Sequence, residues 1–443
     1  MARLNVLNLS GIPGTKAIAN TTHEGAPAKT ITAEQELRRS VLACMLWEDQ
    51  FYEDGVAIAG RIRELVPRVA AEKVAALAVD AREKMKLRHA PLLLVREMAR
   101  LITHRRLVAD TLLRIIQRAD ELSEFVALYW GENKQPLSAQ VKKGLAAAFT
   151  KFDEYALAKY DRASPVRLRD VLFLCHARPM DAAQAELWKR LVAGELATPD
   201  TWEVALSSGA DKREAWERLL AENKLGALAL LRNLRNMKEA GVDEQLVRTG
   251  LYRMKTERVL PFRFIAAARY APQWEPELEK AMFRCLEGQT RLPGKTVLLV
   301  DVSGSMDAPL SRRAEMRRND AAYGLAILLR EIAEQVSIYT FSDKLVRVPG
   351  RRGFALRDAL NASQPHRGTY LGRSLGELDE KYDRLIVITD EQSHDSVSNP
   401  QARGYVINVA SFKNGVGYGK WVHIDGWSDS VIEYIRAAEP ALE

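Results

Sequence analysis

The chain contains the stretch Thr296-Val-Leu-Leu-Val-Asp301-Val-Ser303-Gly-Ser305-Met306, an apolar run that ends in one carboxylate and two hydroxyls. Its apolar residues do not alternate with polar ones, which predicts a strand buried on both faces of a parallel sheet. Asp301 then lies at the carboxyl end of the strand, the edge where open α/β sheets bind ligands. A turn there can direct Asp301, Ser303 and Ser305 at one point. These hard oxygen ligands suit Mg²⁺ or another divalent cation such as Mn²⁺.

The pattern Asp-x-Ser-x-Ser after a buried strand resembles the metal-ion-dependent adhesion site (MIDAS) of von Willebrand factor A domains. Such domains complete the site with a threonine in a Gly-Thr loop and an aspartate at the end of a later strand. Gly368-Thr369 precedes a helical pattern here, and Arg384-Leu-Ile-Val-Ile-Thr-Asp390 is a second apolar run that ends in a carboxylate. The resemblance therefore implies that Thr369 and Asp390 join the metal site. The alternative is a serine-rich turn in which Asp301 caps the next helix.

Residues 293–443 carry further patterns that predict a doubly wound α/β sheet with helices on both faces. Strands are expected at 336–341, 345–348, 404–409 and 421–424, and helices from Ser311 to about Glu334 and over 429–436. The predicted fold class is thus α plus α/β, with a Rossmann-like A domain at the C-terminal end.

Composition places the chain among ordinary soluble globular proteins, because 47% of its 443 residues are hydrophobic and 28% are charged. No apolar run approaches the roughly 20 residues of a membrane span, and the N-terminus lacks the apolar core of a signal peptide. The sequence therefore predicts a cytoplasmic protein without a membrane partner, and we expect a monomer.

The formal charge of +7 is unevenly distributed along the chain. Residues 1–292 contain 46 Lys and Arg against 38 Asp and Glu, whereas residues 293–443 contain 19 against 20. A basic first part suggests a polyanion such as nucleic acid as its partner, although a modest excess also occurs in proteins that bind none.

The first part of the chain is predicted to be almost entirely helical. Residues 1–32 contain many turn formers and predict an extended arm. From Thr32 to about Arg291 the apolar spacing predicts short helices joined by short loops, as in stacked HEAT or armadillo pairs. After a first helix that opens at Thr32, helices are expected at 53–66, 68–87, 91–103, 105–117, 120–130, 138–150, 151–160, 167–176, 181–192, 200–207, 211–222, 224–240, 243–250 and 276–287.

The helix expected at 167–176 carries basic groups and an aromatic ring along one flank. Arg169, Phe173 and His176 share a stripe beside its apolar face, because residues seven apart lie only about 20° apart on a helix. Such groups suit phosphate contact and stacking on an RNA base. The alternative is a solvated helix flank with a capping histidine.

The segment around this helix resembles the TROVE module of the Ro autoantigen family. It begins with Lys159-Tyr and a short loop with Arg162, and continues from Arg167-Leu-Arg169-Asp to His176-Ala-Arg-Pro. A TROVE module followed by a von Willebrand A domain is that family's arrangement. The resemblance assigns residues 20–291 to the module and 293–443 to the A domain.

The resemblance implies a ring of HEAT-like helical pairs that the A domain closes. Its basic outer face would bind small structured (Y-type) RNA, and its central hole would take single-stranded ends of misfolded or decaying RNA. Family members act in small-RNA quality control, in bacteria alongside exonucleases. Lys159 and His176 match positions that the family uses for Y-RNA contact. A third basic position falls on Ala163, with Arg162 and Arg167 close enough to substitute.

A ring threaded by single-stranded RNA needs cations on its inner wall. The candidates, chosen for their closely spaced and exposed placement, are Arg105, Arg106, Lys142 and Lys143.

Two classes of function follow from these observations. We favour a non-catalytic RNA-binding scaffold. The alternative is a protein-interaction adaptor whose A domain grips an acidic side chain of a partner through Mg²⁺. An enzyme is not expected, because the sequence shows no Ser-His-Asp order, zinc spacing or phosphate loop.

Overall fold

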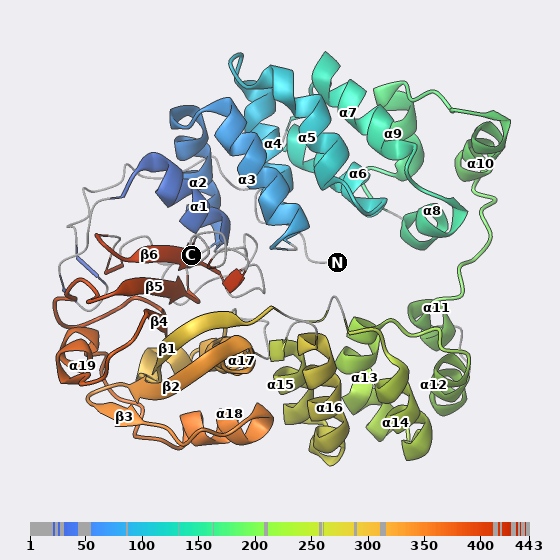
Figure 1. Cartoon of the computed structure of the whole chain (residues 1–443). Helices are drawn as coiled ribbons and strands as arrows, with labels where there is room; N and C mark the ends of the chain where they lie inside the picture. The colour runs from blue at the N-terminus through green and yellow to red at the C-terminus, as the bar shows by residue number, and fades with distance from the viewer. Residues whose placement is uncertain are drawn as a thin grey trace. The chain divides into compact units, whose positions relative to one another are not determined.

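The chain forms two compact units (Figure 1). The computed structural model describes residues 21–22, 25–26, 31–42 and 55–439, apart from gaps at 86, 132, 163, 208–210, 257–258, 260, 288–289, 311–315, 411–414, 417–418, 427–430, 433–434 and 436–438. Most of the predicted N-terminal arm and of the last predicted helix therefore lies outside the described residues. Among those described, no helix has the length and hydrophobicity that crossing a bilayer requires.

Unit 1 consists of helices, most of which stack in two rows. They are α1 (Ala33–Leu42), α2 (Gly55–Leu65), α3 (Ala71–Glu83), α4 (His89–Arg100), α5 (Val108–Ile115), α6 (Asp120–Trp130), α7 (Ala139–Phe149), α8 (Glu154–Tyr160), α9 (Leu168–Cys175) and α10 (Ala182–Ala193). One row runs through α1, α3, α5, α7 and α9, and the other through α2, α4 and α6. Packing of each helix on the next but one is the arrangement of HEAT-like pairs, as the sequence predicts.

The approach of α7 to α5 depends on Gly144. A Cβ atom at this position would lie 2.8 Å from the Leu112 Cβ and 2.9 Å from the Ala109 carbonyl oxygen, so any larger residue would push the two helices apart. α7 begins after Ser138, whose hydroxyl accepts a hydrogen bond from the Val141 N–H at 3.4 Å. The glycine contact and the cap together fix the direction in which the side chains of α7 project.

Unit 2 begins with a second set of stacked helices. They are α11 (Trp202–Ser207), α12 (Lys212–Ala221), α13 (Ala227–Glu239), α14 (Glu244–Arg253), α15 (Pro261–Tyr270) and α16 (Glu275–Leu286). One row runs through α13 and α15 and continues into the sheet domain, because α15 packs on α17 (Arg318–Ile332). The other runs through α12, α14 and α16, and α16 packs on α18 (Gly353–Asn361).

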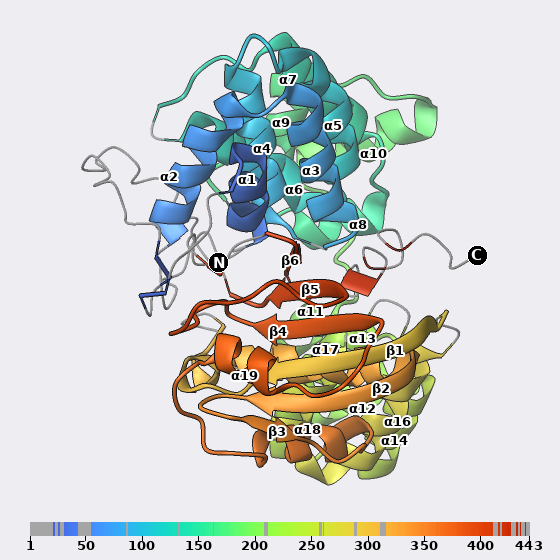
Figure 2. The same ribbon diagram turned by 60° about the vertical axis from the view of Figure 1, so that its left-hand side comes forward.

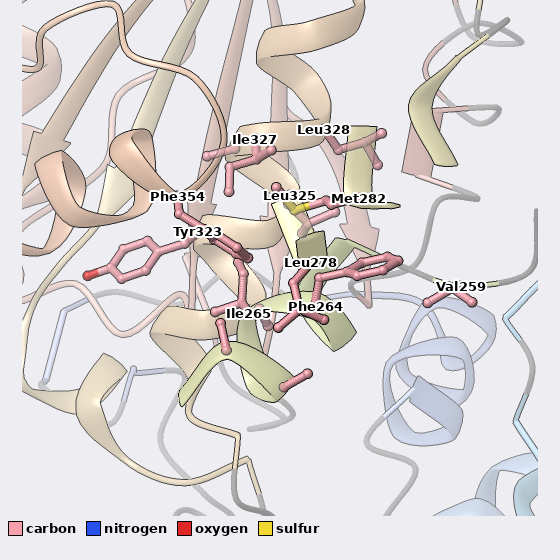
Figure 3. Close-up of a cluster of buried hydrophobic side chains, with 14 of the residues drawn as sticks. Val259, Phe264, Ile265, Leu278, Met282, Tyr323, Leu325, Ile327, Leu328 and Phe354 are labelled. Atoms are coloured by element: carbon pink, nitrogen blue, oxygen red, sulfur yellow. The ribbon is translucent and has the colours of Figure 1, made fainter. Parts of the chain in front are cut away.

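One hydrophobic core joins these helices to the sheet domain. Figure 3 shows part of it, with Phe264 and Ile265 of α15 and Met282 of α16 beside Leu325 and Leu328 of α17. The compact units accordingly divide between Thr201 and Trp202. The predicted module limits of 20–291 and 293–443 describe the sequence resemblance and stay a prediction.

Helix α15 is missing from the helices expected from the sequence. It begins at Pro261, a residue favoured in the first turn of a helix. Its buried residues Phe264, Ile265 and Ala268, together with Ala271 directly after it, follow the spacing of one helical face, a signal present in the sequence.

The sheet has six strands in the order β3-β2-β1-β4-β5-β6 (Figure 2). They are β1 (Leu292–Asp301), β2 (Ala333–Phe341), β3 (Leu345–Arg347), β4 (Arg384–Thr389), β5 (Arg403–Asn408) and β6 (Val422–Asp425). β3 is antiparallel to β2, and the other neighbours are parallel. The connections reverse direction at β1, between β2 and β4, as in a doubly wound fold. The predicted fold class is confirmed, whereas closure of the helices into a ring stays a prediction.

Helices cover both faces of β1. Leu298 and Val300 belong to the core shared with α17, whereas Val297 and Leu299 pack in a second core with Leu371 of α19 (Leu371–Glu377). Burial on both sides explains why the sequence of this strand does not alternate between apolar and polar residues.

The shared core of unit 2 can be tested with Phe264→Ala. Removing this fully buried ring should lower the free energy of unfolding of unit 2 by about 3–5 kcal/mol. Because one core joins helices and sheet, amide exchange should speed up in β1 and α17 as well as in α15. The measurement is denaturant unfolding with hydrogen-exchange mass spectrometry, and Leu228→Ala, at a 46% exposed position of α13, is the control. Faster exchange confined to α15 would contradict the shared core.

Candidate metal and RNA-binding sites

The two aspartates of the predicted metal site lie on neighbouring strands. Asp301 is the last residue of β1, and Asp390 directly follows β4. The two strands pair in parallel with Val300 opposite Ile388, so their carboxyl ends meet at the edge where the strand order reverses. Both aspartates are fully buried. The fold therefore brings together two carboxylates that are far apart in the sequence.

Hydrogen bonds fix the Asp301 carboxylate. One oxygen accepts from the Ser303 N–H at 2.8 Å, and the other accepts from the Thr389 hydroxyl at 2.5 Å. The Ser303 and Ser305 hydroxyl oxygens lie 3.3 Å apart, so the two are close enough to share one ligand. The sequence prediction had no role for Thr389, which is the strand neighbour of Asp301.

Backbone contacts tie together the loops that carry the other predicted ligands. The Gly304 N–H donates to the Arg367 carbonyl at 2.8 Å, and the His394 N–H donates to the Thr369 carbonyl at 2.8 Å. The Thr369 N–H in turn donates to His394 Nδ1 at 3.1 Å. His394 thus positions the backbone of Thr369.

A short N-terminal segment also packs on these loops. The Thr22 hydroxyl donates to the Ser393 carbonyl at 2.9 Å, and both residues are buried. The Ser393 hydroxyl in turn accepts a hydrogen bond from the Leu371 N–H at 3.2 Å, just beyond Thr369. The described residues of the predicted arm up to Ile31 therefore belong to unit 2.

Among the described residues, the electrostatics of the site are set by the carboxylates of Asp301 and Asp390 and by the guanidinium of Arg318. Burial, and after it the charge of Asp390, raises the pKa of Asp301 well above its usual range. Arg318, on the first turn of α17, places its Nη1 3.0 Å from Asp390 Oδ2 and 3.3 Å from the Ser305 carbonyl oxygen. No feature of the arginine-rich stretch around Arg318 distinguishes this residue in the sequence.

These residues fit a hard divalent cation by their chemistry. A raised carboxyl pKa means that negative charge at Asp301 is incompletely compensated, and a divalent ion would compensate it. Among the described residues no group of three His, Cys, Asp or Glu side chains is arranged to hold a metal. A site here therefore depends on the serine and threonine hydroxyls besides the two aspartates, and the five-ligand set stays a prediction.

The predicted RNA-binding stripe of α9 lies on the surface of unit 1. Arg169 and His176 are exposed, and the Phe173 ring is 62% exposed. His176 ends the helix in the left-handed conformation (φ 54°, ψ 42°), one that histidine adopts more readily than most residues. The backbone of His176 thus caps α9, as expected for the alternative of a solvated flank with a capping histidine, while its side chain remains exposed.

Lys142 joins this stripe from the neighbouring helix. Its Nζ lies 3.4 Å from His176 Nε2, because α7 packs beside α9. We name Lys142, Arg169, Phe173 and His176 the α7–α9 surface. The contact joins Lys142 to the stripe, and its assignment to an inner wall stays a prediction.

The remaining stripe candidates are placed on α8 and on the loop that follows it. Lys159 is half-buried, with its Nζ 5.7 Å from the centroids of the Tyr155 and Tyr160 rings. Arg162 and Arg167 are exposed, and the Arg167 N–H donates to the Asp170 carboxylate at the start of α9.

The other inner-wall candidates differ in their surroundings. Lys143 is exposed on α7. Arg106 is exposed but forms an ion pair with Glu72, and the Arg105 Nε donates to the Ala99 carbonyl at 3.3 Å. The charge of Arg106 is therefore partly offset by Glu72.

Comparison with known proteins relates part of the chain to the TROVE domain, which matches residues 181–318. Over 100 residues the chain is 34% identical to telomerase protein component 1 of Mus musculus and 33% identical to that of Rattus norvegicus, matches that cover 20% of this chain. The chain spans only 4% of the length of these relatives.

A solved structure shares the fold of the chain. The crystal structure of the Deinococcus radiodurans RO (RSR) protein matches with a TM-score of 0.61 and 18% identity, over 92% of this chain and 99% of that chain. The TROVE match ends at Arg318 and thus includes Asp301, Ser303 and Ser305, whereas the α7–α9 surface lies before it.

Without divalent ions, the buried carboxylate of Asp301 should lower the free energy of unfolding by an amount that depends on pH. Its pKa is raised in the folded state, so the folded protein holds this proton over a range in which the unfolded chain has released it. The loss of free energy of unfolding caused by Asp301 therefore grows as the pH rises from about 4 toward neutrality. Asp301→Asn should gain stability relative to the wild type between pH 5 and pH 8 in EDTA, as measured by urea unfolding.

Asp358→Asn, at an exposed aspartate of α18, is the control and should show the same difference from the wild type at both pH values. A difference for Asp301→Asn that does not change with pH would show that this carboxyl titrates normally.

Proposed function

We propose, on the premise that this chain is a Ro-like member of the TROVE family of RNA-binding proteins, that it acts as a non-catalytic scaffold for RNA. Its ligands would be small structured RNA of the Y type and the single-stranded ends of misfolded or decaying RNA. We place this role in cytoplasmic RNA quality control, with an exoribonuclease as a partner.

The observation that carries the proposal is the composition of the α7–α9 surface. Lys142 and Arg169 can neutralise phosphates, and the exposed Phe173 ring offers a face to an unstacked base. An ammonium can only donate hydrogen bonds, so His176 Nε2 accepts from Lys142 and its ring faces remain available for stacking. Cations and stacking groups on adjacent helices form the combination that single-stranded and looped RNA requires.

The metal site supports a second part of the proposal. We propose that Asp301, Ser303, Ser305, Thr369 and Asp390 hold one Mg²⁺ or Mn²⁺. The ion would offer an open coordination position to an outside oxygen ligand. Support comes from the adjacent ends of β1 and β4 and from the 3.3 Å approach of the two serine hydroxyls. A protein adaptor that uses this site to grip an acidic residue remains the alternative function.

The RNA proposal predicts distinct effects for the residues of the α7–α9 surface. His176→Ala and Phe173→Ala should weaken binding of a hairpin RNA by about 1–3 kcal/mol with little change in salt dependence, because they remove stacking groups. Lys142→Ala and Arg169→Ala should also flatten the plot of log affinity against log salt concentration by about one unit each, because each removes a phosphate contact. Filter-binding titrations at several salt concentrations measure both quantities.

The matched control is Lys189→Ala on α10, which removes an exposed lysine of unit 1 that pairs with Glu186. It should leave affinity and slope unchanged. Wild-type affinity in all four variants would show that the α7–α9 surface does not bind this RNA and would favour the adaptor function.

The metal proposal predicts that Mg²⁺ raises the melting temperature of the protein by mass action. Asp301→Ala should lose this response, because the remaining ligands hold only one carboxylate. Asp358→Ala, the exposed counterpart on the same unit, should keep it. Differential scanning calorimetry across micromolar to millimolar Mg²⁺ makes the comparison, and an unchanged response in Asp301→Ala would place any metal elsewhere.

A further inference from the structure

We infer that Arg318 is a tethered cation that competes with the divalent ion for Asp390 and thereby sets the metal affinity of the site. The inference rests on the proposed metal site and adds to it a residue outside the five predicted ligands. Its starting point is a single side chain that contacts two of the loops expected to surround the ion.

The Arg318 side chain is built into the site. It is only 4% exposed, and its partner Asp390 is fully buried. Nη1 lies 3.0 Å from Asp390 Oδ2 and 3.3 Å from the Ser305 carbonyl oxygen, so one guanidinium nitrogen joins the loop after β4 to the loop after β1. Desolvation makes an ion pair of this kind much more consequential than one on the surface, since removing either partner leaves a buried charge.

Three contacts hold the first turn of α17, where Arg318 lies. The first is made by the backbone of Arg318. Its N–H donates to the Ala308 carbonyl at 3.1 Å, beyond the serine loop. The Arg317 N–H donates to the Asp320 carboxylate at 2.8 Å, which caps the first turn of α17. Asp320 also pairs with Arg269 of α15 at 2.7 Å. The guanidinium is thus held at Asp390 by the same packing that joins the helices of unit 2 to the sheet.

Counted over the residues that the structure describes, the site then holds three fixed charges, those of Asp301, Asp390 and Arg318, instead of two. Two carboxylates alone would just balance a divalent ion, whereas the guanidinium leaves the loaded site with an excess positive charge. An arginine cannot relieve this repulsion by losing its proton. The cation must therefore bind against Arg318 or displace it from Asp390, and either route weakens binding.

Arg318 also stabilises the protein when the divalent concentration is low. With the guanidinium in place, Asp390 keeps a partner whether or not an ion is bound. The sheet domain can then fold without the ion, and occupancy of the site follows the free concentration of divalent cation. Without Arg318, folding and metal binding would be coupled, because a buried carboxylate that has lost its cation is destabilising.

The experiment measures Mn²⁺ affinity by electron paramagnetic resonance and thermal unfolding in EDTA, for the full chain. Arg318→Met keeps the aliphatic length and removes the charge. It should bind Mn²⁺ at least about tenfold more tightly than the wild type, because one like charge has been removed from the site. It should also melt at a lower temperature in EDTA and recover with Mn²⁺. Arg330→Met removes an arginine from the far end of α17 and should change neither the affinity nor the recovery.

Two further variants make the outcome decisive. Arg318→Lys keeps the charge but not the fork of donors, so its affinity should lie between those of the wild type and Arg318→Met; it decides the question if Arg318→Met fails to fold. Asp301→Ala should abolish binding. Equal affinities for the wild type and the Arg318 variants, with binding lost in Asp301→Ala, would overturn the role of Arg318 and leave the metal site intact. Absence of Mn²⁺ binding in every variant would overturn the metal site and this inference together.

Discussion

The burial of α17 on two sides is the contact on which unit 2 depends. A surface helix normally buries one stripe, yet α17 is buried at every residue from Arg318 to Leu329. The sheet covers one side and α15 the other, as the side chains in Figure 3 illustrate. This packing orients the first turn of α17 toward the ends of β1 and β4. The position of Arg318 beside Asp390 is therefore a result of the hydrophobic packing of α17.

The local sequence predicts the two strands that end in the aspartates of the site, but not the arginine that balances the charge of those aspartates. Apolar runs that end in Asp301 and Asp390 predict two buried strands, and parallel pairing then brings their ends together. Arg318 could not be found in this way, because its neighbours in sequence include other arginines and its role comes from the tertiary position of α17. α15 is a different case, since its pattern is readable but lies beside a proline that usually marks a boundary.

The α7–α9 surface shows the same division between local and tertiary information. The stripe on α9 follows from helical spacing alone, because Arg169, Phe173 and His176 lie on one helix. Lys142 joins it only because α7 packs beside α9. Sequence separation gives no sign of the contact between Lys142 and His176, and exposed position alone does not tell which surface a lysine serves. The conformation of His176 adds a local constraint, because the residue whose backbone ends α9 also carries the exposed imidazole ring.

The shared core of unit 2 has a consequence for synthesis on the ribosome. Phe264 and Met282 emerge before α17 and α18, the helices that cover them. Some 75 residues separate the end of α16 from the end of α18, a delay on the order of ten seconds at typical elongation rates. The core of unit 1, in contrast, is complete once Leu191 has been made. A nascent chain therefore carries a folded first half and an exposed apolar face for several seconds, an interval in which holding chaperones have a defined surface to bind.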